Sequence, residues 1–520
     1  MKNCLKPYYP LPFIMYLRLS FCLLAAFLGN LFISTLALSA EDKSSPQPTK
    51  KERLTIAPEE MMKPWTGDLD GMIQRRFIRV LTTYSKTFYF ADKGTQHGIT
   101  YDMFRLFEED LNKKLAKEKK RKHLKVQVVF IPVGRDQLLQ ALAAGKGDIA
   151  AANLTITPER QKLVDFTTPF YPNVSELVIS GPDSPVVSGV DDLAGKVVFV
   201  RKSSSYYESL VELNRRFTTE KKPTVIIREA PETLEDEDLL EMVNARLIPL
   251  IVVDKHFADF WKQIFPKIRV NEGAALRTGG NIAPAIRKGS PQFKAALDDF
   301  WTRHGKGTDT GKTILMRYLK RTKYVKDASS ESERKKFLTL IQFFKKYGDQ
   351  YDVDWLLMAA QGYQESQLNQ AARSKVGAIG VMQVMPKTGK DLAVGDISKA
   401  EPNIHAGIKY MRWMIDQYYG KEPMTKQDKA LFAFASYNAG AGRIAQMRKE
   451  AARRGLDPNV WFHNVEHVAA EKIGAETVTY VANIYKYYIA YNLLMEARAE
   501  KEKTMEKLKG QGSRFPLLTT

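Results

Sequence analysis

The feature that most constrains the fold is an alternation of strand-like and helix-like segments early in the chain. Residues 76–82 and 126–132 are rich in apolar and β-branched side chains and are predicted to be strands. Residues 101–114 and 137–144 have the apolar spacing of helices. Strands that alternate with helices have both faces of their sheet covered. The pattern therefore predicts α/β layers in this part of the chain.

A different pattern occupies the last third, where a helix carries a candidate catalytic acid. Asp354 can cap a helix with Leu356 and Tyr363 on one apolar face, and Glu365 falls near its last turn. A carboxyl there faces the negative end of the helix dipole, and apolar neighbours would remove water from it. Because both effects raise its pKa, Glu365 is a candidate general acid at neutral pH.

Three polar segments accompany this acid. Residues 372–386 form a glycine-punctuated loop, residues 436–442 end an Ala- and Phe-rich helix in a Gly-rich turn, and residues 474–481 begin another helix. Tyr480 follows Glu476 by four residues, so the two share a helix face. Spacing alone does not establish that the three segments meet in space.

Together these segments resemble the four ordered motifs of the soluble lytic transglycosylase family. The matching positions are Glu365-Ser366, residues 372–386, Tyr437 to Gly440, and Glu476-Thr477 with Tyr480-Val481. The resemblance covers about residues 335–500 and implies a mostly helical, lysozyme-like domain. Such a domain would cleave the MurNAc–GlcNAc bond of peptidoglycan without water or any cofactor, leaving 1,6-anhydro-muramyl ends.

The resemblance also implies roles for individual residues. Glu365 would protonate the leaving oxygen and then, as carboxylate, take the proton of the muramyl C6 hydroxyl, so a single acid suffices where ordinary glycosidases need two. Glu476 would be structural, and Met382 would pack behind the acid. The residues expected to line the cleft are Ser374, Gln383, Tyr437, Asn438 and Tyr480.

Other functions stay open on the sequence. A hydrolase of goose-lysozyme type would use the same acid with water as nucleophile, and a non-catalytic sensor would only bind glycan. Residues 463–467 also read as HxxEH, which can place two imidazoles on one helical turn around zinc. A polar helix face is the favoured interpretation of that segment, so no metal is expected.

The α/β part resembles the family 3 solute-binding proteins over about residues 75–303. Its matching phrases are residues 139–148 (LQALAAGKGD), 154–160, 192–196 and 286–291. The resemblance implies two lobes that close on a ligand by a hinge motion. Because this part is fused to the enzyme, we expect that an amino acid or a wall-derived peptide bound there regulates cleavage.

Three residues of this part are implied as ligand contacts. Arg160 would clamp a ligand carboxylate, Asp254 would meet an amino group and Ser204 would offer a hydroxyl. The opposing interpretation is a retained scaffold in which Arg160 pairs with Glu159 or Asp165.

The beginning of the chain predicts export. Basic residues precede an apolar run over residues 19–38, and Ala37 to Ala40 is typical of a signal-peptide cleavage site, although an uncleaved anchor is the alternative. The only cysteines, Cys4 and Cys22, lie in this leader. A net charge of +20 would suggest nucleic acid as a partner inside the cell, but an exported protein does not meet it there. We expect a periplasmic protein, peripheral on the outer membrane, whose basic surface faces wall carboxylates and lipid head groups.

The expected chain is therefore multidomain, with a two-lobed α/β periplasmic-binding-protein-like domain followed by a mostly α lysozyme-like domain. The boundaries are a signal peptide over 1–40, a linker over 41–72, the binding domain over 73–305, a connector over 306–334, the catalytic domain over 335–500 and a basic tail over 501–520.

Overall fold

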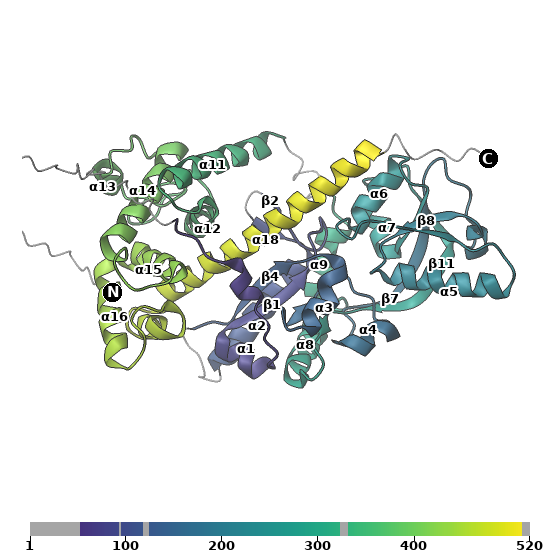
Figure 1. Ribbon diagram of the computed structural model, residues 1–520, viewed down its shortest axis with the longest axis horizontal. Helices are drawn as coiled ribbons and strands as arrows, with labels where there is room; N and C mark the ends of the chain where they lie inside the picture. Colours follow the sequence, from purple (N-terminus) through teal and green to yellow (C-terminus); the bar gives the residue numbers. More distant parts are fainter. Residues whose placement is uncertain (1–52, 93–94, 118–123, 323–330, 512–520) are drawn as a thin grey trace, which may run out of the picture. The chain divides into compact units, whose positions relative to one another are not determined.

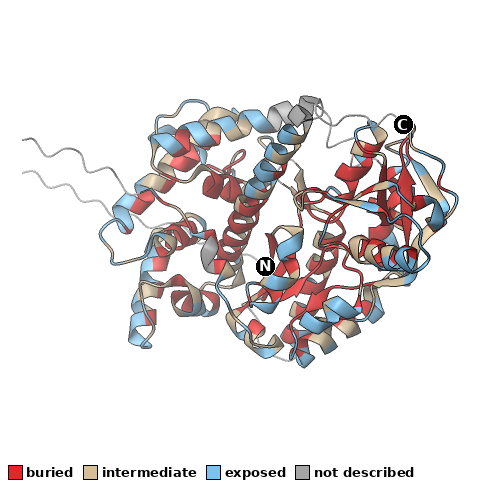
Figure 2. Cartoon of the chain, turned by 45° about the vertical axis from the view of Figure 1, so that its right-hand side comes forward, coloured by how far each residue is buried: buried red, intermediate tan, exposed pale blue. Residues whose placement is uncertain are grey.

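A computed structural model describes residues 53–92, 95–117, 124–322 and 331–511, so the predicted leader and the last nine residues lie outside the described part. The predicted fold class is confirmed: two α/β lobes precede a mostly helical domain (Figure 1). Buried strands lie at the centre of both sheets, and more exposed helices cover them (Figure 2).

The first lobe is built on a five-stranded sheet of order β4-β1-β5-β12-β6. Strand β1 lies between β4 and β5 and runs parallel to both, as expected for strands joined by helices. The strands span Phe77–Thr82 (β1), Gln127–Pro132 (β4), Ile149–Ala150 (β5), Asp165–Phe166 (β6) and Ala285–Ile286 (β12), and a hairpin joins β2 (Phe90–Asp92) and β3 (Thr95–His97). The helices are α2 (Ile99–Lys117), α3 (Leu138–Ala143), α4 (Pro158–Leu163), α8 (Pro291–His304) and α9 (Asp309–Leu319), with a short turn η2 at Arg135–Gln137.

The second lobe has a sheet of order β11-β7-β10-β8-β9, and two crossings, near residues 166–171 and 282–285, join it to the first lobe. Its strands are β7 (Tyr171–Ser180), β8 (Val197–Val200), β9 (Ile226–Glu229), β10 (Leu250–Asp254) and β11 (Arg269–Ile282). Its helical segments are η3 (Val190–Leu193), α5 (Ser205–Thr219), α6 (Asp236–Asn244) and α7 (Lys255–Trp261).

The third part is helical, and its helix α12 begins where the sequence predicts, because the Asp354 carboxylate accepts the Leu356 N–H at 2.9 Å. Buried faces of α12, α15 and α18 form its core. The helices are α11 (Glu331–Gln350), α12 (Trp355–Ser366), α13 (Pro386–Asp391), α14 (Ala400–Tyr418), α15 (Lys426–Ala439), α16 (Ala441–Arg453), η4 (Trp461–Val465), α17 (Glu466–Lys472) and α18 (Ala475–Gln511).

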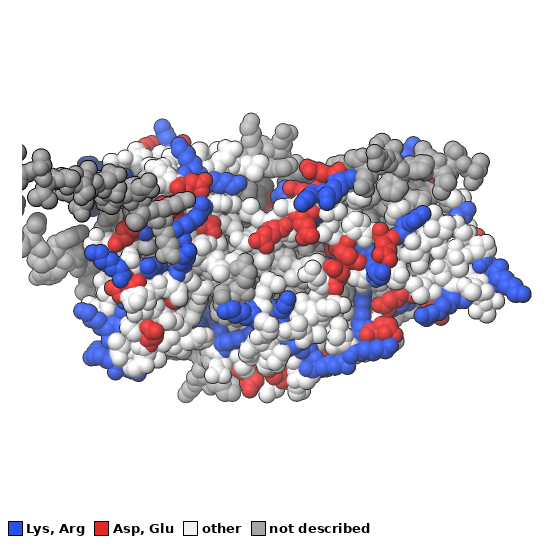
Figure 3. Space-filling view, viewed as in Figure 1, with Lys and Arg blue, Asp and Glu red and all other residues white. Residues whose placement is uncertain are grey.

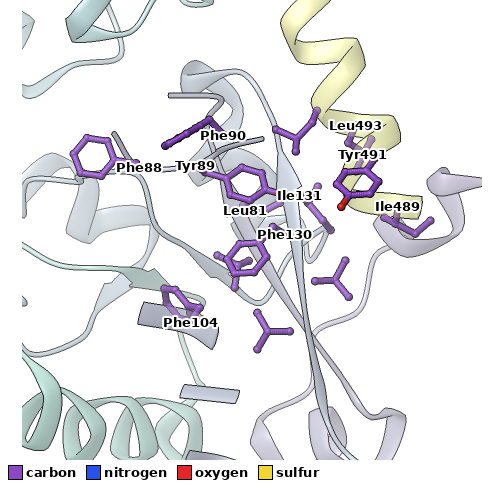
Figure 4. Close-up of a cluster of buried hydrophobic side chains, with 14 of the residues drawn as sticks. Leu81, Phe88, Tyr89, Phe90, Phe104, Phe130, Ile131, Ile489, Tyr491 and Leu493 are labelled. Atoms are coloured by element: carbon purple, nitrogen blue, oxygen red, sulfur yellow. The ribbon is translucent and has the colours of Figure 1, made fainter. Parts of the chain in front are cut away.

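Helix α18 also packs against strand β4 of the first lobe. Its residues Ile489, Tyr491 and Leu493 join the buried cluster that contains Phe130 and Ile131 (Figure 4). Lys486, buried in the same contact, donates to the Gln127 side-chain oxygen at 2.8 Å. One helix thus belongs to the cores of two domains.

The structure differs from three expected boundaries. Part of the expected linker is packed, with η1 (Pro58–Met62), α1 (Leu69–Arg75) and a buried Leu54 that bridges to Val353. Helix α9 buries Ile314 and Tyr318, so the binding domain continues past residue 305. Helix α18 runs past residue 500 because Lys501 forms a buried ion pair with Asp238 at 2.5 Å. In each case a few buried or ion-paired side chains inside a polar stretch extend the packed domain beyond the expected boundary.

Candidate active site

Glu365 occupies the next-to-last position of α12 and meets α18 there. Its Oε1 accepts a hydrogen bond from the Tyr480 hydroxyl at 2.5 Å. Burial raises the pKa of Glu365 to about 7, and the hydrogen bond from Tyr480 opposes part of that rise. At neutral pH the carboxyl is thus poised between its acid and carboxylate forms.

Two tyrosine hydroxyls beside Glu365 stay protonated. Burial, followed by the charge of Glu365, holds the pKa of both Tyr437 and Tyr480 well above the usual value. The Tyr437 hydroxyl, at the end of α15, donates to the Met382 carbonyl at 2.8 Å. Both phenols therefore act as hydrogen-bond donors around the acid.

Met382 is fully buried and packs against Gly362 of α12. Gly362 allows this approach, because a Cβ at that position would lie 3.1 Å from the Met382 sulfur. The Met382 amide donates to the Asn403 side-chain oxygen at 2.8 Å, which anchors the loop on α14. Gly380, with φ at +77°, turns the loop where a Cβ would strike Asn403.

Ser374 and Gln383 use their polar groups inside the loop. The Ser374 hydroxyl accepts the Ala378 amide at 2.9 Å, and the Gln383 amide donates to the Gly380 carbonyl at 2.8 Å. These bonds satisfy backbone groups that a tight loop leaves without sheet or helix partners. The two residues shape the loop and are not among those that line the cavity beside Glu365.

A cavity of about 400 Å³ opens beside the acid. It is lined by Gln364, Glu365, Asn438, Ala475, Glu476, Thr479 and Tyr480. Of the expected cleft residues, Asn438 and Tyr480 lie here, and Asn438 accepts a hydrogen bond from the Thr477 hydroxyl at 2.7 Å. Glu476, expected to be structural, is exposed on the wall of this cavity, and its helical spacing from Tyr480 was the signal that could have placed it there.

The HxxEH segment has a different geometry from a helical zinc motif. His463 adopts φ of +62°, and α17 begins only at Glu466, so the two histidines do not share one helical turn. The buried Glu466 carboxylate pairs with Arg76 and accepts the His463 amide. Among the described residues, no group of three His, Cys, Asp or Glu side chains is arranged to hold a metal ion.

The three residues expected to bind a ligand lie between the two α/β lobes and contact protein groups there. Arg160 donates to the Thr155 carbonyl of the first lobe and to the Ser203 carbonyl of the second, both at 2.8 Å. The Ser204 hydroxyl donates to the Arg201 carbonyl and accepts the Tyr207 amide as the cap of α5.

Asp254 ends β10 as a buried carboxyl. It accepts a hydrogen bond from the Asn153 amide at 2.7 Å, and burial, followed by the charge of Glu176, raises its pKa well above the usual value. Asn153 also helps to line a cavity of about 40 Å³, but Arg160, Ser204 and Asp254 are not among the residues that line it.

Comparison with known proteins gives two domain matches. Residues 78–320 match the bacterial extracellular solute-binding proteins, family 3, and residues 342–459 match the transglycosylase SLT domain. Among solved structures, an ancestral arginine-binding protein bound to arginine covers 46% of this chain and 97% of its own, at 22% identity and a TM-score of 0.36.

Curated relatives match along most of the chain. The membrane-bound lytic murein transglycosylase F of Desulfosudis oleivorans is 28% identical over 429 residues, 79% of this chain and 89% of the relative. The protein of the same name from Pseudomonas fluorescens is 27% identical over 453 residues, 82% of this chain and 87% of the relative. Within the described residues, no helix is long and apolar enough to span a membrane.

Both resemblances predicted from the motifs are confirmed. The solute-binding match covers all the phrases that carried its prediction, and the SLT match covers the first three motifs, while the fourth, at residues 476–481, lies beyond its end at residue 459. The curated relatives align over 79% and 82% of the chain, more than either domain match covers alone. The chain therefore combines a family 3 solute-binding-protein-like domain with a transglycosylase SLT domain, and over about four fifths of its length it is similar to proteins named membrane-bound lytic murein transglycosylase F.

Proposed function

We propose that this protein is a lytic transglycosylase that cleaves the MurNAc–GlcNAc bond of peptidoglycan, with Glu365 as acid and then base. The observation that carries the proposal is a half-buried carboxyl with a pKa of about 7 at the wall of an open cavity. Its position in a chain that matches both domains of lytic murein transglycosylases supports the substrate class.

The reaction has two proton transfers that pass through the same carboxyl. Protonated Glu365 gives its proton to the glycosidic oxygen while the bond from that oxygen to the muramyl C1 breaks. The Glu365 carboxylate then takes the proton of the C6 hydroxyl as O6 bonds to C1. The products are a free GlcNAc hydroxyl and a 1,6-anhydro-muramyl end, and Glu365 is protonated again.

Neighbouring groups assist each half of this cycle. Burial favours the acid that starts the reaction, while the Tyr480 hydrogen bond favours the carboxylate that forms midway. Asn438 and Glu476 on the cavity wall are suited to bind sugar hydroxyl and N-acetyl groups. Met382 and the loop around Ser374 and Gln383 support the site, because the Tyr437 hydroxyl donates a hydrogen bond to the Met382 carbonyl.

Digestion of purified sacculi tests this proposal. Mass spectrometry of the products should find 1,6-anhydro-muropeptides with wild-type protein and none with Glu365→Gln, while Glu365→Gln still sediments with sacculi. Reducing muramyl ends would instead favour the hydrolase of goose-lysozyme type. Intact glycan would favour the non-catalytic sensor.

We further propose that the two-lobed domain is a regulatory module for an amino acid or a wall-derived peptide, contacted through Arg160, Asp254 and Ser204. Helix α18 supports a coupling to the acid, because Lys486 contacts the first lobe, Lys501 contacts the second, and Tyr480 bonds Glu365. Free amino acids and soluble muropeptides should raise the melting temperature and change the cleavage rate. Unchanged melting and rate with all of them would favour a retained scaffold.

The site of action that fits this proposal is the periplasm, with peripheral contact to the outer membrane after export by the leader. Lysine and arginine side chains are interspersed with acidic ones on the face shown in Figure 3. The net charge of +20 nevertheless favours anionic wall and lipid surfaces. Fractionation of cells that produce the full chain tests this: washing with high salt should release the protein from membranes.

A further inference from the structure

A buried glutamine stands behind the pair formed by Glu365 and Tyr480. Gln361 lies one helical turn before Glu365 in α12, and its side chain is fully buried. Its Nε2 donates to the Tyr480 hydroxyl oxygen at 3.1 Å, and that hydroxyl donates to Glu365 Oε1 at 2.5 Å. The three side chains therefore form a chain of hydrogen bonds that ends on the acid.

The chemistry of the amide fixes the direction of this chain. The nitrogen of a glutamine side chain can only donate, and a phenol has one proton. When the Tyr480 oxygen accepts from Gln361, the Tyr480 proton is left to point at Glu365. Tyr480 then offers Glu365 a donor and not an acceptor, so the proton of the acid stays on the other carboxyl oxygen.

Packing alone does not explain a glutamine at this position. Within the described part of the chain, the Gln361 side-chain oxygen is buried and has no hydrogen-bond partner. Leaving such an oxygen unpaired is unfavourable, and an apolar side chain of the same length would avoid this cost. The donor nitrogen is thus the part of this side chain that has a role.

We propose that Gln361 is a positioning residue that orients the Tyr480 hydroxyl toward Glu365 and so sets how readily the acid becomes a base. The inference rests on the proposed function, because only a carboxyl that serves in both forms needs this control. A fixed donor stabilises the carboxylate for the second proton transfer. It also keeps the acid proton away from Tyr480 and available to the glycosidic oxygen.

The groups that face Glu365 allow a defined pH test. Tyr480 from α18 and Tyr437 from α15 are the titratable neighbours, and both stay protonated because their pKa values are well above the usual one. Glu476 is the other carboxyl on the wall of the cavity. Removing the Gln361 donor should weaken the Tyr480 bond and raise the pKa of Glu365.

The test compares Gln361→Met, Tyr480→Phe and the double variant with wild-type protein. Gln361→Met has a similar length without a donor, and it should move the midpoint of the pH profile of kcat/KM upward by about half a pH unit. It should also lower kcat by about threefold to tenfold, with a smaller change in KM. Tyr480→Phe should move the midpoint further, and Gln361→Met should add nothing to that shift in the double variant.

Two readouts separate this inference from the proposed function. The protonated carboxyl band of Glu365, assigned by its loss in Glu365→Gln, can be titrated by infrared spectroscopy without any turnover. If no anhydro products formed, the proposed function would be refuted. The midpoint of the infrared titration of Glu365 would still show whether Gln361 changes the pKa of this carboxyl. An unchanged midpoint in Gln361→Met, or a further shift in the double variant, would overturn the role of Gln361. Melting temperatures of all variants show that each one is folded.

Discussion

The candidate active site at Glu365 and the candidate ligand site between the two α/β lobes differ in what their polar groups contact. At the cavity of about 400 Å³, the Glu365 carboxyl meets Tyr480 and still borders open volume. Between the lobes, Arg160 bonds carbonyls of both lobes, and Asp254 accepts a hydrogen bond from Asn153. The first site is formed in advance for a substrate, whereas Arg160 and Asp254 of the second already bond protein groups.

The largest effect that this comparison predicts is the loss of cleavage in Glu365→Gln. Because the amide cannot give up a proton as the carboxylic acid does, we expect the rate to fall by about a thousandfold or more. Release of soluble muropeptides from sacculi measures it. Glu476→Gln is the matched control from the same cavity and should keep the anhydro product. If Glu476→Gln lost cleavage as completely, a second carboxyl would be needed and the single-acid mechanism would be wrong.

The pH dependence of the wild-type enzyme sharpens the picture of a site formed in advance. Glu365 must be protonated to start the reaction, and burial places its pKa at about 7. We therefore expect kcat/KM to fall about tenfold per pH unit above that value, because the acid form is lost. Initial rates on soluble glycan strands across pH 5 to about 9 measure this. A rate that rises steadily through this range would contradict it.

For the site between the lobes, the expected effect is on stability and not on catalysis. Arg160→Met removes two partly buried hydrogen bonds from a charged group to carbonyl oxygens. We expect a loss of about 1.5–3 kcal/mol in the free energy of unfolding. Without added ligand, the cleavage rate should stay within about twofold. Denaturant unfolding measures the loss, and Arg215→Met, at an exposed ion pair, is the control with no measurable change. Wild-type stability in Arg160→Met would contradict a stabilising bond from Arg160 to each lobe.

The last effect concerns the stability cost of the acid itself. The pKa of Glu365 is 4.5 in its unperturbed state and about 7 in the folded protein. As pH rises through this window, the unfolded chain releases the proton before the folded one does, so folding loses stability. Glu365→Gln removes that loss, and its melting temperature should exceed that of wild type above pH 7 but not at about pH 4.5. Equal differences at both pH values would contradict a raised pKa.

Local signals in the sequence predicted the elements but not all of their contacts. The Asp354 cap and the apolar face of α12 placed Glu365 correctly at a helix end, because capping and periodicity act over a few residues. The bond between Tyr480 and Glu365 joins residues 115 positions apart, and only the resemblance suggested that they meet. Gln361 was missed, although its spacing of four residues from Glu365 marks the same helix face.

Polar residues in loops were the least predictable. Ser374 and Gln383 were expected to line the cleft, yet the side chain of each bonds a backbone group of its own loop. A sequence shows that a hydroxyl or amide is present but not whether the backbone already uses it. The contact of α18 with strand β4 could not be predicted either, because it depends on how two domains pack against each other.

The central claim is that the sugar supplies its own nucleophile to a site with one working acid. Cleavage of sacculi in water enriched in oxygen-18 tests this claim most directly, with the label read at the muramyl C1 by mass spectrometry. The mechanism through Glu365 predicts anhydro-muramyl products that carry no label. Products with a labelled reducing end would show attack by water and would contradict the account.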